Sequence, residues 1–318
     1  MKNKLLYKLR SGKNPKFIYY SVNALRLVIP KGIFRLRLQG KLSSLSRRKD
    51  KDYIERRVDY YNKLSGTVQL PSSAPHLSEH KMSKQKVYFF DTYQYTRWFS
   101  DQFQWGFCPG DVTFVPDYPS IVKSRPLTDD NVNSIVMKLD KVRHFIFVDD
   151  KKAFTEKKNM VKGKPSRKLF MEMYFHHPMC DLGDVSKNTT DPAEWRTEKK
   201  TINEHLDYKF IMALEGIDVA SNLKWVMSSN SIAVMPRPTC ETWFMEGTLI
   251  PNYHYIEIKP DFSDLEERLN YYIEHVDESL EIIRHAHEYV SQFKDKRREN
   301  LISLLVLDKY FKMTGQKS

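Results

Sequence analysis

The sequence predicts an α/β protein with two compact domains and a separate basic segment at its N-terminus. Its 318 residues exceed the ~100 to 200 residues that are typical of one domain. Short apolar runs alternate with stretches of helical periodicity, which is typical of a layered α/β fold. The third observation is that the positive charge is concentrated in one part of the chain.

Residues 1–49 form a basic arm. They contain fourteen of the 52 Lys and Arg residues and no Asp or Glu, which leaves 38 basic residues against 40 acidic residues in the rest of the chain. A protein that binds nucleic acid spreads basic and aromatic residues over its folded surface. The near-neutral body therefore speaks against nucleic acid as a partner.

The arm also carries large apolar side chains. Between residues 16 and 38 they alternate with Lys16, Arg26 and Arg37, a mixture that is typical of segments that lie on an anionic membrane. A basic helix docked on the body is the alternative interpretation. We find neither a signal peptide nor an apolar run near the ~20 residues that span a bilayer, and therefore expect a cytoplasmic protein peripheral to the inner face of the membrane.

The body begins after a charged linker at residues 47–52. A helical pattern through Ile54, Val58, Tyr61 and Leu64 comes first, and a turn-rich loop over residues 69–84 follows it. Apolar runs bounded by turns then predict strands at residues 87–90, 112–115, 135–137 and 145–148.

The second half repeats this rhythm. Strands are predicted at residues 159–161, 210–214, 232–235 and 253–258. The Ser-x-x-Glu spacing of Ser263 and Glu266 predicts a capping box at a helix start, and helices over residues 280–293 and 301–311 follow.

Residues 209–235 predict a strand, a Glu-Gly turn, a helix that opens near Ser221 or Asn222, and a second strand. The start of such a helix offers free N–H groups and a positive dipole end, which suit a diphosphate. Gly216 in the turn and Lys224 on the helix are further candidates for this site.

Two segments contain side chains that could bind a metal ion. Asp149 and Asp150 follow an apolar run and could hold Mg²⁺ or Mn²⁺, but two lysines follow them directly. The segment FHHPMCDLG at residues 175–183 lacks a second ligand pair at zinc spacing. The three cysteines form no CxxC pair and predict neither a zinc site nor a disulfide framework.

The segments KFIMALEG, ASNLKWVMSSNSIAVM and ETWFMEGTLIPNYHYIEIKPDFSDLEERLNYYIEH, all between residues 209 and 275, resemble the donor-binding half of glycosyltransferase family 90. This family includes lipopolysaccharide-core and capsule glycosyltransferases and the protein O-glucosyltransferases. The resemblance extends over residues 52–293, and NPKFIYYSVNALRLVIPK in the arm is similar to the bacterial lipopolysaccharide branch.

The resemblance implies a GT-B-like architecture, in which two Rossmann-like domains face each other across a cleft. It implies four parts: a membrane-associating arm at 1–51, an acceptor-side domain at 52–155, a domain that binds the UDP-sugar donor at 156–293 and a C-terminal helix at 294–318. It further implies an inverting transfer to a glycolipid or oligosaccharide acceptor without a metal cofactor.

The family's Asp-Tyr-Pro motif appears in VTFVPDYP, and the resemblance implies that Asp117 is the catalytic base. Pro116 stands where the family usually has Arg. Taken from its neighbours alone, Asp117 is an aspartate in a turn before Pro119. An inverting transfer needs one carboxylate that takes the proton of the acceptor hydroxyl.

A second family element, an Arg-Gly turn with a basic residue after it, resembles MVKGKPSRKLF. It implies that Lys162, Gly163 and Arg167 contact the UDP phosphates and replace a divalent metal. Lys162 stands where many members have Arg, and Asn222 stands where the eukaryotic branch has Arg.

Glu241 in ETWFMEG lies in the loop where a GT-B enzyme commonly holds the ribose or the sugar hydroxyls. A carboxylate there accepts hydroxyl protons. A solvated loop acid is the alternative interpretation. Two competing functions also stay open: a metal-dependent GT-A-type transferase that uses Asp149 and Asp150, and a non-enzymatic protein that acts through the basic arm.

Overall fold

The structure is a computed structural model that describes residues 12–163, 168–185 and 190–316. The chain divides into two compact units. We call the first the sheet unit; it comprises Met1–Asn14, Arg143–Pro238 and Thr248–Gln292. The second, the helical unit, comprises Pro15–Val142, Thr239–Gly247 and Phe293–Ser318. These bounds differ from the predicted division, because residues 15–51, 239–247 and 293–318 all join one unit.

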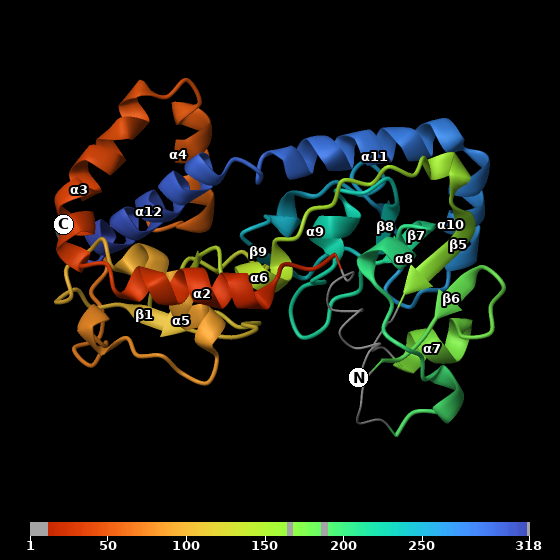
Figure 1. Ribbon diagram of the computed structural model, residues 1–318, viewed down its shortest axis with the longest axis horizontal. Coiled ribbons are helices and arrows are strands. Elements are labelled where there is room, and N and C mark those ends of the chain that lie inside the picture. The colour runs from red at the N-terminus through yellow and green to blue at the C-terminus, as the bar shows by residue number, and fades with distance from the viewer. Residues whose placement is uncertain (1–11, 164–167, 186–189, 317–318) are drawn as a thin grey trace. The chain divides into compact units, whose positions relative to one another are not determined.

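The sheet unit is built on a five-stranded parallel sheet in the order β10-β8-β7-β5-β6 (Figure 1). Its strands are β5 (Lys158–Gly163), β6 (Cys180–Leu182), β7 (Tyr208–Met212), β8 (Ile232–Met235) and β10 (Ile256–Glu257). Its helices are η3 (Phe154–Glu156), α7 (Lys168–Tyr174), η4 (Ala193–Trp195), α8 (Ile202–His205), α9 (Leu223–Val226), α10 (Leu265–Glu274) and α11 (Val276–Ser291). The parallel α/β class that the sequence predicted is confirmed.

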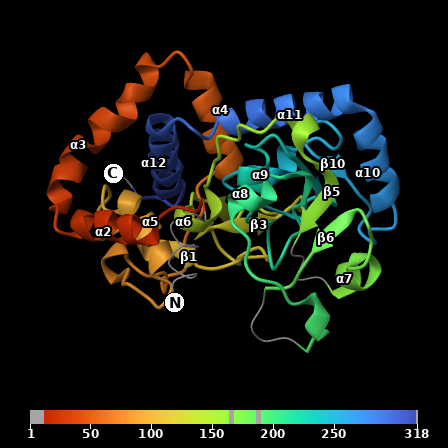
Figure 2. The same cartoon turned by 45° about the vertical axis from the view of Figure 1, so that its right-hand side comes forward.

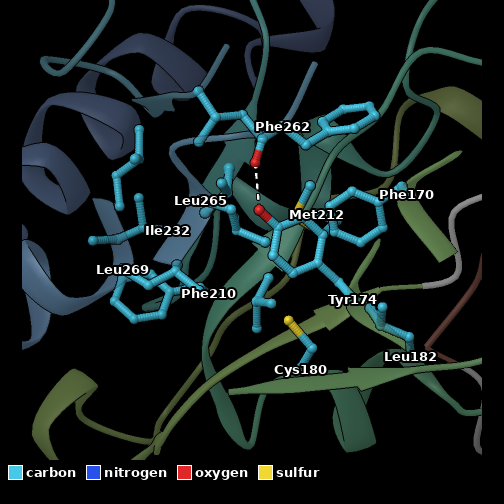
Figure 3. Packing of buried hydrophobic residues seen from close by; sticks show 14 of the residues in the cluster. Phe170, Tyr174, Cys180, Leu182, Phe210, Met212, Ile232, Phe262, Leu265 and Leu269 are labelled. Atoms are coloured by element: carbon cyan, nitrogen blue, oxygen red, sulfur yellow. Dashed lines mark hydrogen bonds between the residues drawn. The ribbon is translucent and has the colours of Figure 1, made fainter. Parts of the chain in front are cut away.

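An apolar core fills the space between this sheet and its helices (Figure 3). Phe210 and Val234 on the central strands and Leu265 and Leu269 on α10 are almost completely buried. At one side of the core the Tyr174 hydroxyl donates a hydrogen bond of 2.6 Å to the Phe262 carbonyl oxygen. The polar end of this tyrosine is thereby satisfied inside an otherwise apolar cluster.

The helical unit contains two small sheets and longer helices. Its helices are α2 (Lys16–Leu27), α3 (Lys31–Ser43), η1 (Ser44–Arg47), α4 (Lys51–Tyr61), η2 (Leu77–Glu79), α5 (Lys86–Thr96), η5 (Glu246–Thr248) and α12 (Lys296–Met313), while α6 (Lys141–His144) and the end of η5 cross the unit boundaries. Strands β1 (Gly106–Cys108), β2 (Ser120–Val122) and β4 (Ser134–Val136) pair in parallel, and β3 (Ser124–Pro126) pairs antiparallel with β9 (Cys240–Thr242). Helix α12 lies beside α4 (Figure 2).

Three predicted strands are wrong. Residues 87–90 lie in α5, and residues 112–115 and 145–148 form no strand. The first error arises because α5 is apolar on most sides, and the periodicity of a short apolar run does not separate a strand from a buried helix. At the third run Val148 N donates to Ser228 Oγ instead of a neighbouring strand.

The helix predicted after Ser263 is present, but the predicted capping box is not. Helix α10 begins at Leu265 after Asp264, whose Oδ1 accepts from Lys259 N at 2.8 Å, and the Ser263–Glu266 capping box does not form. The charged linker at residues 47–52 is in part ordered, because Asp50 pairs with Arg48 and Arg298.

Candidate functional site

The strand order of the sheet unit reverses between β5 and β7. From β5 the chain goes to β6 on one side and returns to β7 on the other side, and then continues outward to β8 and β10. In open α/β sheets such a switch point leaves a crevice at the carboxyl ends of the strands, where ligands bind. The candidate donor site is therefore at the ends of β5 and β7, next to Gly163 and Met212.

Gly163 ends β5 and lies close against β7. A Cβ atom at this position would be 3.0 Å from Cβ and Cγ of Met212, so a side chain here would press against the central strand. Glycine at this position therefore allows β5 to pack closely against its neighbouring strands at their carboxyl ends. Residues 164–167 follow directly, and the predicted phosphate contact Arg167 lies outside the described residues.

The loop after β7 contains the other predicted candidates. Gly216 is exposed with open space around its Cα, and Ser221 is half-buried. Asn222 Nδ2 donates to the Met212 carbonyl oxygen at 2.8 Å, which ties the loop back to the end of the strand. The site residues Gly163, Gly216 and Asn222 therefore share one edge of the sheet.

The helix after this loop is shorter than the sequence suggested. Helix α9 begins after Asn222 as predicted, but it spans one turn only. The dipole of a helix is summed over aligned peptide units, so one turn contributes little of it. Lys224 on this turn is completely buried, which removes it from the surface donors. The carboxyl edge of the sheet is thus a better argument for an anion site than α9.

Lys162 is held by a partner on β6. Its Nζ lies 2.5 Å from Asp181 Oδ1, and the Tyr208 hydroxyl donates to the other oxygen of the same carboxylate. Burial raises the pKa of Asp181, but the hydrogen bonds from Lys162 and Tyr208 outweigh it, and the net pKa lies below its ordinary value. In this arrangement the positive charge of the Lys162 ammonium group is balanced by the Asp181 carboxylate.

A cavity of about 160 Å³ lies beside this pair. It is lined by Lys158, Lys162, Asp181, Lys200, Glu204, Asp207 and Tyr208. Three lysines face three carboxylates there, so the cavity carries no excess charge. Its lining extends along β5 from Lys158 at the amino end to Lys162, which directly precedes Gly163.

Sequence reasoning missed two charged residues at the carboxyl edge. Arg237 follows β8, and its Nε lies 3.1 Å from Oε1 of Glu257 on β10. Both side chains reach solvent. Next to them the Tyr255 hydroxyl is buried without a hydrogen-bond partner among the described residues. The one available signal was the position of Arg237 directly after a predicted strand.

Asp117 belongs to the helical unit, in the loop between β1 and β2, and is exposed. The loop is anchored on both sides of it. Asn133 Nδ2 donates to the Pro116 carbonyl oxygen at 3.0 Å, and the Tyr310 hydroxyl donates to that of Pro119 at 2.9 Å. The anchored backbone presents the Asp117 carboxylate to solvent.

Gly106 on β1 makes this anchor possible. Its backbone N donates to the Tyr310 hydroxyl oxygen at 2.8 Å. A Cβ atom at this position would lie 2.6 Å from the Pro119 carbonyl oxygen and 2.2 Å from Ser120 Oγ. Only glycine fits between β1 and the end of the Asp117 loop without a shift of the backbone.

The predicted position of Glu241 in the donor-binding domain is wrong. Its segment belongs to the helical unit, and the residue is 1% exposed on β9. Oε1 accepts from Arg125 Nε at 2.7 Å, and Oε2 accepts from the Tyr60 hydroxyl. Both carboxylate oxygens have internal partners, so Glu241 is not a solvated loop acid.

The two carboxylates considered for a metal are used differently. Asp149 is exposed and pairs with Lys151, whereas Asp150 is buried and accepts from Lys157 Nζ and Asn230 N. No group of three His, Cys, Asp or Glu side chains that could hold a metal occurs within residues 12–163, 168–185 and 190–316. The carboxylate of Asp150 is therefore engaged inside the sheet unit, whereas that of Asp149 faces solvent.

A parallel α/β sheet with a glycine-lined edge at its switch point is typical of enzymes that bind nucleotide-like ligands. Comparison with known proteins gives a more specific result. The family model "Glycosyl transferase family 90" matches residues 150–315. The chain is also 38% identical over 266 residues to the O-glucosyltransferase LpsA of Dichelobacter nodosus. The aligned region covers 82% of this chain and 83% of the relative.

The chain therefore belongs to glycosyltransferase family 90, as the sequence motifs predicted, and it is a glycosyltransferase. This membership overturns the non-enzymatic alternative. The matched range contains the complete five-stranded sheet and continues into α12.

Proposed function

We propose that the protein is an inverting glycosyltransferase that transfers a hexose or pentose from a UDP-sugar to a hydroxyl group of a lipopolysaccharide core or a similar glycan. Family membership is the observation that carries this proposal. The name of the similar O-glucosyltransferase LpsA favours glucose and a lipopolysaccharide acceptor. The proposal specifies a donor crevice and a base, which lie on different units of the chain.

The donor crevice is the carboxyl edge of the sheet unit. Gly163 ends β5 at this edge, and the loop that contains Gly216, Ser221 and Asn222 borders it. The exposed guanidinium of Arg237, which also pairs with Glu257, is a candidate phosphate contact, and the family motif nominates Arg167 as another, since guanidinium groups bind phosphate oxygens through paired hydrogen bonds. Lys162 would join them only after release from Asp181.

Positive side chains at the diphosphate would stabilise the charge that develops on UDP as it leaves. A divalent metal does the same work in other transferases. We therefore propose a metal-independent reaction with no cofactor besides the donor.

Asp117 would act as the general base. Its carboxylate takes the proton from the acceptor hydroxyl while the acceptor oxygen forms a bond to the anomeric carbon. The bond between that carbon and the UDP oxygen breaks on the opposite face, which inverts the configuration. An exposed carboxylate on an anchored loop suits this role, because the acceptor approaches from solvent.

A glycolipid acceptor implies work at a membrane. No helix within the described residues is long and apolar enough to cross a bilayer. We propose a peripheral location on the cytoplasmic face, with anionic lipid as the partner of residues 1–49 and with no role for nucleic acid.

UDP binding is the first test of the donor site. Calorimetry on the full chain in EDTA, with GDP, ADP and CMP as controls, should show selective binding of UDP. Binding that appears only after Mn²⁺ is added would reject metal independence. If none of the nucleotides binds with or without metal, the proposed donor class is rejected.

Asp117→Asn tests the base. The amide keeps the shape of the side chain but cannot accept the proton, so transfer should fall by roughly 100- to 10,000-fold. Affinity for UDP should stay unchanged, because the proposed base acts on the acceptor hydroxyl and not on UDP. Asp129→Asn, at another exposed aspartate of the same unit, is the matched control. Turnover of Asp117→Asn at the level of this control would reject the role.

A further inference from the structure

Helices α2 and α3 are docked on the helical unit through one face. The Tyr19 hydroxyl donates to Asp91 Oδ1 at 2.7 Å, and Arg26 Nη1 donates to Gln94 Oε1 at 3.0 Å. On α3, Lys31 and Arg35 both pair with Asp101. The predicted alternative of a basic helix docked on the body is thus confirmed for these two helices.

Phe34 shows that the docked face of α3 also packs. Its ring lies against Trp98 with a centroid distance of 5.1 Å, and the Arg97 guanidinium lies 3.7 Å from its centre. Leu38 and Leu42 follow at helical spacing and are buried. The inward face of α3 therefore has its own core contacts and needs no further partner.

The outward sides of both helices and the turn between them carry exposed apolar side chains. Leu36 is 89% exposed, Phe17 82% and Val28 77%. The other large apolar residues that are exposed on this segment are Ile18, Val22, Leu25, Leu27, Ile29 and Ile33. On α2 the exposed Ile18, Val22 and Leu25 recur at helical spacing and form a stripe next to that of Tyr19, Asn23 and Arg26. We call these nine residues the outer face.

A soluble surface rarely presents so many neighbouring apolar side chains without a binding partner. The charge around the outer face is positive, which favours a negatively charged partner. Lys16, Arg37 and Lys41 are exposed on the same helices, and no Asp or Glu occurs in residues 1–49. A second copy of the chain would bring the same positive charge against this face and be repelled.

We propose that the outer face of α2 and α3 is the membrane-contact surface of this protein and that its partner is a bilayer containing anionic phospholipid. Apolar side chains would enter the boundary between headgroups and acyl chains, while Lys16, Arg37 and Lys41 meet the lipid phosphates. The inference names the residues behind the peripheral location in the proposed function, on which it rests.

Because α2 and α3 are docked on the helical unit, a membrane contact through them would also orient this unit. Hydrogen bonds and ion pairs hold α2 and α3 on the same unit that contains Asp117. A membrane bound to the outer face would therefore fix the orientation of the Asp117 loop relative to the lipid surface. A glycolipid acceptor anchored in that surface would meet the loop from a constant direction.

Vesicle flotation of the full chain tests the proposal. The wild type should bind vesicles of phosphatidylcholine with phosphatidylglycerol and bind pure phosphatidylcholine much less. The variant Phe17→Ser/Leu25→Ser/Leu36→Ser should lose at least about tenfold in binding, because three apolar side chains no longer enter the interface. The matched control Met82→Ser/Ile250→Ser/Leu280→Ser changes three exposed apolar residues elsewhere and should bind like the wild type.

A charge variant separates the two contributions. Lys16→Glu/Arg37→Glu/Lys41→Glu should lose binding to the anionic vesicles but keep the residual binding to the neutral ones. UDP calorimetry on every variant reports the donor site independently, so a failure of the lipid proposal and a failure of the donor proposal are distinguished.

Several results would overturn the proposal. Absence of wild-type binding to anionic vesicles would reject the partner, and equal binding to neutral vesicles would reject its anionic nature. If the serine variant floats like the control, the outer face is not the contact surface. A wild-type dimer in gel filtration that the serine variant converts to a monomer would assign the outer face to a second copy instead.

Discussion

The main buried clusters of the two units differ in chemistry. In the sheet unit an apolar cluster lies between the central strands and α10 (Figure 3), and the buried Lys224 and the Lys157–Asp150 pair are not part of this cluster. In the helical unit charged side chains lie inside: Arg57, Arg125, Glu241 and Glu299 are each at most 3% exposed. Buried charges are costly unless they are paired, and here each of them has a partner of opposite sign.

Buried ion pairs connect distant parts of the helical unit. Each unit is assembled from three stretches of the chain, and in the helical unit these are residues 15–142, 239–247 and 293–318. Glu299 on α12 accepts from Arg57 on α4, Lys138 after β4 and the Trp243 indole after β9. One carboxylate therefore joins all three stretches.

The largest effect is expected from Glu299→Gln. The amide leaves Arg57 and Lys138 without their counter-charge inside the unit, and breaking such a pair costs about 3 to 5 kcal/mol of unfolding free energy. Urea unfolding followed by fluorescence measures it, with the exposed Glu55→Gln on α4 as control. A loss below about 1 kcal/mol would mean that the ionic interior does not hold the unit together.

Leu269→Ala tests the apolar interior of the sheet unit. Leu269 on α10 is completely buried, and its truncation leaves a cavity that costs about 2 to 5 kcal/mol. Leu269→Met keeps the volume and should cost less than about 1.5 kcal/mol. Equal losses of unfolding free energy in Leu269→Met and Leu269→Ala would contradict this prediction. They would mean that the apolar core depends on the exact shape of its side chains, as the ion pairs of the helical unit depend on their exact partners. Leu280→Ala, on the exposed side of α11, is the control.

The smallest effect concerns pH and is shared by both units. Burial lowers the pKa of His80 in the helical unit and of His254 in the sheet unit from 6.5 to about 4. A neutral buried histidine binds its proton more readily when unfolded, so stability is complete above pH 6.5 and decreases as the pH falls towards 4. Urea midpoints between pH 7 and pH 4.5 should show this decrease, and it should be smaller in His254→Asn and in His80→Asn. An unchanged slope in both variants would contradict the assignment.

Much of the sheet unit could be predicted from the sequence. Strands β7 and β8 coincide with apolar runs, because they are buried along their whole length, whereas β5 is buried only at its carboxyl end and was recognised from a shorter run. The glycine of the crevice was found through a family motif, and the structure adds the physical reason in its distance to Met212.

The helical unit was harder to predict, and Glu241 shows why. Its partner Arg125 is 116 residues away in the chain, and no local pattern announces that the two form a buried pair. Lys162 was likewise named for its charge, while Asp181 on the neighbouring strand neutralises it. Residue type indicates which chemistry is available, but tertiary pairing decides whether a charge is left for a ligand.

The interrupted path of the chain has a consequence for biosynthesis. Residues 15–142 are translated long before α12, which supplies Glu299 and the Tyr310 hydroxyl that anchors the Asp117 loop. The unit with the earliest helices therefore stays incomplete on the ribosome until nearly the whole chain has been made, whereas domains commonly fold from the N-terminus onward during synthesis. During that interval Arg57 and Lys138 lack the carboxylate of Glu299, and their burial without it would be costly.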